Sequence, residues 1–139
     1  MSEPGTARVT ALCDPQTGSI IAIAHVAVVE IAAAMASKLR GKFITASQYD
    51  RALRDLLSDA SHQYELVQVD QRLITLAVDL TRRHKLRGYD AIHLAAGILL
   101  NASLLSRTLP PLVVITADHD QLTADQAEGL PVENPHPYR

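Results

Sequence analysis

Short apolar runs alternate along the chain with longer stretches in which apolar residues recur every three or four positions. The short runs predict buried β-strands and the longer stretches predict helices. The predicted strands cover residues 20–24, 64–69, 112–116 and 130–133. The predicted helices cover residues 3–13, residues 26–39, a stretch from residue 45, a stretch after residue 70, residues 89–105 and a short segment before residue 129.

Local signals mark the ends of several predicted helices. Thr45 followed three residues later by Gln48 is a capping-box pattern, and Asp70 can cap the next helix. Gly41 and the Pro110–Pro111 pair are typical helix stops. The alternation of strands and helices predicts an α/β fold around a mainly parallel sheet, and the unbroken apolar strands agree with burial on both faces.

The length and composition agree with one soluble domain over residues 1–139, with a loose tail at residues 135–139. Hydrophobic residues make up 47% and charged residues 20%, and the net charge of −2 excludes a protein that wraps nucleic acid with a basic surface. The single cysteine, Cys13, excludes an intramolecular disulfide and suits the cytoplasm. The longest apolar run, residues 20–36, is short for a membrane span and contains His25 and Glu30, so we expect no membrane segment.

Three carboxylates stand at unusual positions in this pattern. Glu30 is the only formal charge in residues 20–36, Asp90 opens an alanine-rich helix, and Asp118 follows the strand at residues 112–116. Each has an ordinary structural explanation: an exposed helix stripe for Glu30, a helix cap for Asp90 and a turn for Asp118. Taken together, they predict carboxylates at the carboxyl edge of the sheet, where a Mg²⁺ or Mn²⁺ ion would offset their repulsion. Such ions support phosphodiester hydrolysis.

The segments that carry these acids resemble a known family. VAVVEIAAA with Glu30, LRGYDAIHLAA with Asp90 and LVVITAD with Asp118 are similar to three of the four acidic motifs of PIN-domain nucleases, in particular VapC-like toxins of type II toxin–antitoxin systems. The resemblance extends from EPGTARV to GLPVENP. It implies a three-layer α/β/α sandwich and a metal-dependent endoribonuclease in which Glu30, Asp90 and Asp118 are catalytic. It also implies a homodimer and inhibition by a partner antitoxin.

The N-terminus departs from the family pattern. The family's first acid ends a central strand ahead of the segment that resembles EPGTARV, and only Met1 and Ser2 precede that segment here. We therefore expect the first strand and its acid to be absent and the activity to be weak or lost. The alternatives are a start codon further upstream, a strand donated by a second chain, a sheet that closes over the gap, or a replacement strand at residues 9–14 with Asp14 as its acid.

Further side chains have weaker signals. Thr116 can orient water or phosphate, or simply favour a strand, and Asp120 can assist Asp118, although we expect it to cap the following helix. Arg82 and Arg87 belong to a basic run that can contact RNA phosphates or complement a helix dipole. His93, one turn after Asp90, is expected to pack rather than bind zinc.

Two rival functions remain open on the sequence. The first is a degenerate PIN module that binds antitoxin or RNA without cutting. The second is an unrelated metal-dependent phosphohydrolase that uses the same three acids. Metal binding and the choice between RNA and small phosphoesters as substrate distinguish the three hypotheses.

Overall fold

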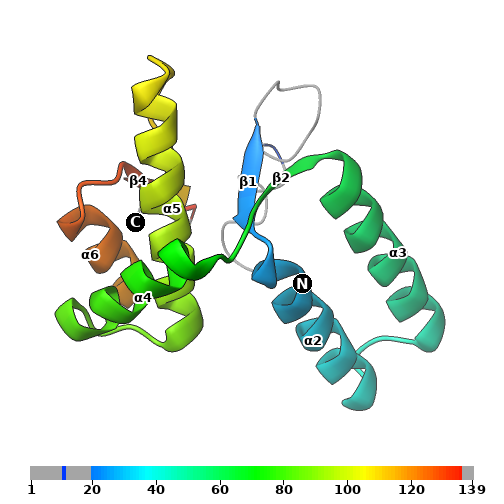
Figure 1. The fold of residues 1–139 in the computed structure, drawn as a ribbon. Helices are drawn as coiled ribbons and strands as arrows, with labels where there is room; N and C mark the ends of the chain where they lie inside the picture. Colours follow the sequence, from blue (N-terminus) through cyan, green and yellow to red (C-terminus); the bar gives the residue numbers. More distant parts are fainter. Residues whose placement is uncertain (1–10, 12–19, 136–139) are drawn as a thin grey trace. The chain divides into compact units, whose positions relative to one another are not determined.

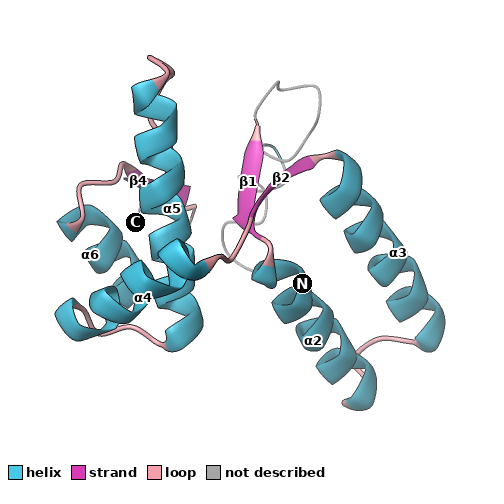
Figure 2. Cartoon of the chain, viewed as in Figure 1, coloured by secondary structure: helices cyan, strands magenta, loops and turns pink. Residues whose placement is uncertain are grey.

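The computed structural model describes residue 11 and residues 20–135, and the chain divides into two compact units (Figure 1). We call residues 20–68 the N-terminal unit and residues 69–135 the C-terminal unit. Each combines helices with one pair of parallel strands, so the predicted mixed α/β class is confirmed (Figure 2). The single domain stays a prediction. Residues 136–139 of the tail, Asp14 and all but one residue of the predicted helix at 3–13 lie outside the described residues.

The N-terminal unit is a strand, a helical hairpin and a second strand. Strand β1 (Ile21–Ala24) leads into helix α2 (Val26–Arg40), and helix α3 (Ala46–His62) leads into strand β2 (Tyr64–Val67). The two strands pair in parallel, with Ile21 opposite Tyr64 and Ala24 opposite Val67. Helices α2 and α3 pack on each other. The buried apolar residues of this unit are Ala24, Ala27, Leu56 and Ala60.

Local hydrogen bonds explain the turn between α2 and α3. Helix α2 ends at Gly41 as predicted, although Lys42, with φ 61°, is the residue in the left-handed conformation. The predicted capping box is confirmed, because Gln48 N donates to Thr45 Oγ1 at 3.1 Å and Thr45 N donates to Gln48 Oε1 at 2.8 Å. The hairpin therefore follows from a few neighbouring residues.

The C-terminal unit is built around two packed helices, α4 (Gln71–Arg83) and α5 (Gly88–Ser106). Asp70 caps α4 as predicted, because its Oδ1 accepts a bond of 2.9 Å from Leu73 N. The alanine-rich face of α5 is buried, which explains the composition of that stretch: small side chains let the two helices approach closely. The buried apolar residues on the two helices are Leu73, Ala77, Leu80, Ala91, Leu94, Ala95 and Ala96.

Short strands and a third helix complete the C-terminal unit. Strand β3 (Val114–Ile115) precedes helix α6 (His119–Ala127), and strand β4 (Val132–Glu133) pairs with β3 in parallel. The strand predicted at residues 112–116 is thus shorter than expected. A β-carbon on Gly97 of α5 would lie 3.4 Å from Leu130 Cδ1, so α5 passes close to the chain that enters β4.

The sheet is smaller than the sequence suggested. Among the described residues, β1 pairs with β2 and β3 pairs with β4, and each pair is a separate two-stranded sheet. The parallel direction of both pairs is confirmed. The single sheet of a three-layer sandwich stays a prediction.

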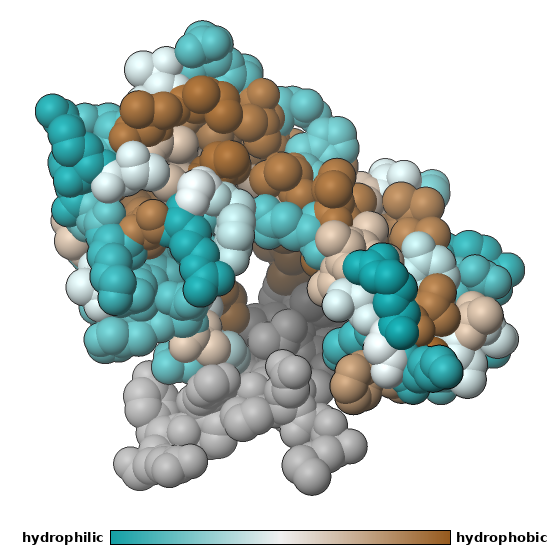
Figure 3. Space-filling view, turned by 90° about the horizontal axis from the view of Figure 1, so that it is seen from below, coloured by the Kyte–Doolittle hydropathy of each residue, from teal (hydrophilic) through white to brown (hydrophobic). Residues whose placement is uncertain are grey.

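Helix α5 is, within the described part of the chain, the one helix long and apolar enough to cross a membrane. Core helices of soluble proteins can have the same length and composition. In α5, 28% of the apolar stretch is buried inside the structure. Apolar side chains are also visible at the surface in Figure 3. The exposed apolar residues of the C-terminal unit include Val78, which is 64% exposed, and Val113, which is 51% exposed.

Candidate functional site

Asp90 lies in the first turn of α5, as the sequence predicted. Arg87 is the N-cap residue of this helix, and its backbone N–H donates to Asp90 Oδ2 over a long 3.4 Å. The Asp90 side chain is half-buried. A carboxylate at a helix N-terminus is favoured by the helix dipole, so Asp90 has the structural role considered from the sequence and still presents oxygen atoms to neighbouring groups.

Asp118 caps α6, the role that the sequence analysis gave to Asp120. Asp118 Oδ1 accepts a bond of 2.9 Å from Gln121 N, and Asp118 N donates to Thr116 Oγ1 at 3.2 Å. The prediction that Asp120 caps the helix was therefore wrong. The helix begins one residue after Asp118, and Asp120 falls in its first turn, 3.7 Å from Lys85 Nζ. Thr116 orients the backbone of Asp118 here.

Arg87 lies within electrostatic range of Asp90 and Asp118, the two predicted metal ligands of the C-terminal unit. Its Nη1 donates to the hydroxyl of Tyr89 at 3.0 Å, and this bond is the main cause that raises the pKa of Arg87. The charges of Asp90 and Asp118 raise the same pKa further. Both carboxylates therefore lie within electrostatic range of one guanidinium, although no described carboxylate is close enough to form an ion pair with Arg87.

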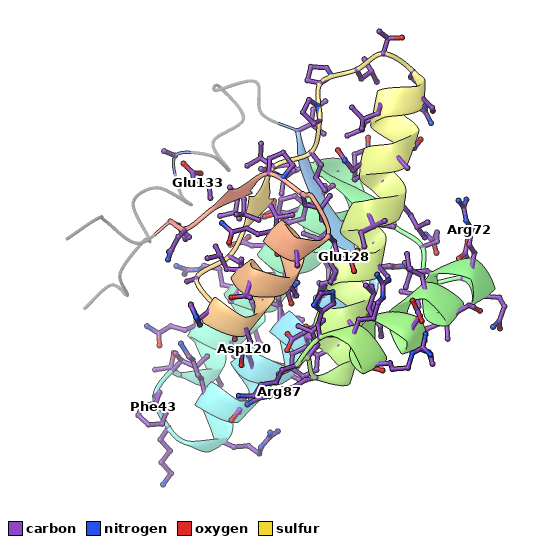
Figure 4. The ribbon with its side chains drawn as sticks, turned by 90° about the vertical axis from the view of Figure 1, so that its left-hand side faces the viewer. Phe43, Arg72, Arg87, Asp120, Glu128 and Glu133 are labelled. Atoms are coloured by element: carbon purple, nitrogen blue, oxygen red, sulfur yellow. The ribbon has the colours of Figure 1, made fainter. Side chains whose placement is uncertain are left out.

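The starts of α5 and α6 thus bring several charged side chains into one region. We call this group, Lys85, Arg87, Asp90, Asp118 and Asp120, the helix-start cluster. Figure 4 shows Arg87 and Asp120 at the end of the C-terminal unit where α6 begins, and Glu128 beyond the other end of that helix. The Lys85–Asp120 contact and the effect of Asp118 on the pKa of Arg87 also indicate that the starts of α5 and α6 lie close together.

Asp125 is a buried carboxylate that the sequence analysis missed. Its side chain has no exposed surface; Oδ1 accepts a bond of 2.8 Å from Gln121 Nε2, and Oδ2 has no hydrogen-bond partner in the described part of the chain. Burial raises the pKa of Asp125 to about 6, and the nearby charge of Asp90 adds to the rise. The available signal was the spacing of Gln121 and Asp125, which places both on one face of α6.

The basic run before Asp90 is used mainly to hold helices together. Arg82 Nη2 lies 2.6 Å from Asp79 Oδ1, and Arg83 contacts both Asp79 and Glu128, the latter at 2.7 Å. His84 Nε2 lies 2.9 Å from the same Glu128 oxygen. The residues at the end of α4 therefore tie it to the end of α6. Of the two predicted RNA contacts, Arg82 is engaged in an ion pair and Arg87 is not.

Glu30 lies in α2 and is half-buried. It belongs to the N-terminal unit, whereas Asp90 and Asp118 belong to the C-terminal unit. The structure therefore brings Asp90 and Asp118 into one region, and the convergence of Glu30 on them stays a prediction.

The donor set decides which metal the helix-start cluster can accept. No group of three His, Cys, Asp or Glu side chains within the described ranges is arranged to hold a metal ion. Magnesium often uses only one or two protein carboxylates, with water and substrate phosphates as the other ligands. Asp90 and Asp118 match that requirement in donor type and in number, and they are too few for a zinc site, which needs three or four protein ligands.

No family model, no curated protein and no solved structure matches this chain. The resemblance to PIN-domain nucleases therefore rests on the motifs around Glu30, Asp90 and Asp118.

Proposed function

We propose that this protein is a Mg²⁺- or Mn²⁺-dependent endoribonuclease of the PIN type, the toxin of a toxin–antitoxin pair. The observation that carries the proposal is that Asp90 and Asp118 stand at the starts of α5 and α6, which the Lys85–Asp120 contact of 3.7 Å brings together, and both carboxylates raise the pKa of Arg87. Two carboxylates beside a cationic side chain suit a site that accepts a metal ion and a phosphodiester.

The residues of the chain have distinct roles in this proposal. Asp90 and Asp118, with Glu30, hold the cation, and Thr116 fixes the backbone of Asp118 through its hydroxyl. When bound, the cation stabilises the negative charge that develops on the phosphodiester. Arg87 orients the substrate by contacting a phosphate oxygen, for which a guanidinium is well suited.

The proposal also includes the fold, the location and the partners that the family resemblance implies. They comprise a three-layer α/β/α sandwich, a cytoplasmic homodimer, an antitoxin protein as partner and RNA as substrate. The parallel pairing of β1 with β2 and of β3 with β4 supports the sandwich, because parallel strands occur almost entirely in sheets covered by helices on both faces.

A test of the proposal is cleavage of a labelled single-stranded RNA in millimolar Mn²⁺. We expect weak, metal-dependent cleavage that the Asp90→Asn variant loses. Asp55→Asn, which changes an exposed aspartate of α3, is the matched control and should cleave as the unaltered chain does. Cleavage that persists in Asp90→Asn would refute the assignment of the site.

A PIN-like module that binds RNA or antitoxin without cleavage is the second candidate. It is favoured by the absence of a three-residue metal group in the described residues and by the use of Asp118 as a helix cap. RNA binding without cleavage at any Mn²⁺ concentration would support it.

A further inference from the structure

Tyr89 is placed unusually for an aromatic residue of a packed helix. It lies in the first turn of α5, next to Asp90, and 44% of its surface is exposed. Other positions on α5 are used for packing, since Ala91, Leu94 and Ala95 are all buried. The ring of Tyr89 is therefore available at the same end of the unit as the helix-start cluster.

The contact between Tyr89 and Arg87 fixes both side chains. Arg87 Nη1 donates to the Tyr89 hydroxyl at 3.0 Å, so the guanidinium and the ring are held together at the start of α5. The contact uses one of the five donor hydrogens of the guanidinium. The remaining donors can bind phosphate oxygens in the planar geometry that arginine provides.

The neighbouring cations differ from Arg87 in their availability. Arg82 and Arg83 are bound to carboxylates at 3.0 Å or less, whereas Lys85 is 90% exposed and lies 3.7 Å from Asp120. Compared with Arg82 and Arg83, Arg87 and Lys85 therefore make fewer or longer contacts with carboxylates of the protein. Arg87 lies within electrostatic range of Asp90 and Asp118, the proposed ligands of the cation, and Lys85 lies 3.7 Å from Asp120.

We propose that Arg87 and Tyr89 form a binding pair for single-stranded RNA, in which Arg87 contacts a phosphate and the Tyr89 ring stacks on an unpaired base. The inference rests on the proposed function for the position of the scissile bond and extends it by naming two residues that would bind the substrate beside that bond. Stacking on an aromatic ring requires a base that is not paired in a duplex. The substrate class is therefore single-stranded RNA, bound with little sequence preference.

The test is fluorescence anisotropy of a labelled single-stranded RNA, measured on the full chain in EDTA so that no cleavage occurs. We expect Tyr89→Leu to weaken binding about tenfold, because it removes the stacking ring. Tyr89→Phe keeps the ring and should bind within about twofold of the unaltered chain. Arg87→Ala should also weaken binding and lower the slope of log K against log salt by about one.

Two controls make the result specific to this pair. Arg72→Ala removes an exposed cation near the other end of α4, which Figure 4 shows well away from Arg87, and should leave binding unchanged. A duplex of the same sequence should bind less tightly and should not respond to Tyr89→Leu. Circular dichroism shows whether each variant is folded.

Several outcomes would overturn the inference: no RNA binding by the unaltered chain, equal binding by Tyr89→Leu, or an equal loss in Arg72→Ala. Metal-dependent cleavage with unchanged binding by Tyr89→Leu would refute the pair and leave the nuclease proposal standing. Loss of binding in Tyr89→Leu without any cleavage by the unaltered chain would support the pair and refute the nuclease proposal.

Discussion

The buried carboxyl group of Asp125 should make the stability of the protein depend on pH in an unusual direction. Most aspartates stabilise a folded protein as pH rises, because their pKa is lowered by folding. Burial instead raises the pKa of Asp125 from 3.8 to about 6. The folded chain therefore holds this proton more tightly than the unfolded chain does.

The size of the effect follows from the two pKa values. Below pH 3.8 the carboxyl group is protonated in both states and contributes no penalty. Between 3.8 and about 6 the unfolded chain loses the proton first, so the free energy of unfolding falls as pH rises through this window. The full difference corresponds to about 3 kcal/mol, of which about 2 kcal/mol develops between about pH 4 and about pH 7.5.

The Asp125→Asn substitution isolates this contribution. Asparagine keeps an oxygen that can accept the bond from Gln121 Nε2 and does not titrate. In urea unfolding, we expect the free energy of unfolding of the variant, minus that of the unaltered chain, to increase by about 2 kcal/mol between about pH 4 and about pH 7.5. Comparing the two pH values cancels any pH-independent cost of the new amide.

Asp120→Asn is the matched control for Asp125→Asn. Asp120→Asn removes an exposed carboxylate from the same helix, so it changes the net charge equally without relieving burial. A difference for Asp125→Asn that stays constant with pH, or falls as pH rises, would mean that Asp125 is not buried as described.

Two further predictions concern helix caps. Asp118→Ala should lower the free energy of unfolding by about 1 kcal/mol, whereas Asp118→Asn keeps the cap oxygen and should cost less than about 0.5 kcal/mol; equal losses in urea unfolding would show that the cap is unimportant. Thr45→Ala breaks the capping box with Gln48 and should cost about 0.5–2 kcal/mol by the same assay; an unchanged midpoint would contradict the role of that box.

The sequence predicted features that depend on nearby residues. The capping box at Thr45, the cap at Asp70 and the end of α2 at Gly41 each involve hydrogen bonds within a few positions, so the pattern alone identifies them. The small side chains of α5 lie within the helix itself, but the helix on which they pack, α4, is not identified by the local pattern.

Features that depend on tertiary packing were missed. Asp125 looks like an ordinary surface residue in the sequence, and its burial follows from the packing of α6 against α5. Asp118 and Asp120 are both plausible caps in the sequence, and the structure shows that α6 begins one residue after Asp118, so Asp118 is the cap. Whether Glu30 shares a cation with Asp90 and Asp118 likewise depends on tertiary structure, which no local pattern specifies, and it stays a prediction.

Binding of Mn²⁺, followed by the electron paramagnetic resonance signal of the free ion, tests most directly whether Glu30, Asp90 and Asp118 share one cation. We expect the unaltered chain to bind one ion, and Glu30→Gln, Asp90→Asn and Asp118→Asn each to weaken binding by about tenfold or more. The Asp55→Asn control should bind as the unaltered chain does. Unchanged Mn²⁺ affinity in Glu30→Gln, or no binding by the unaltered chain, would contradict the shared site.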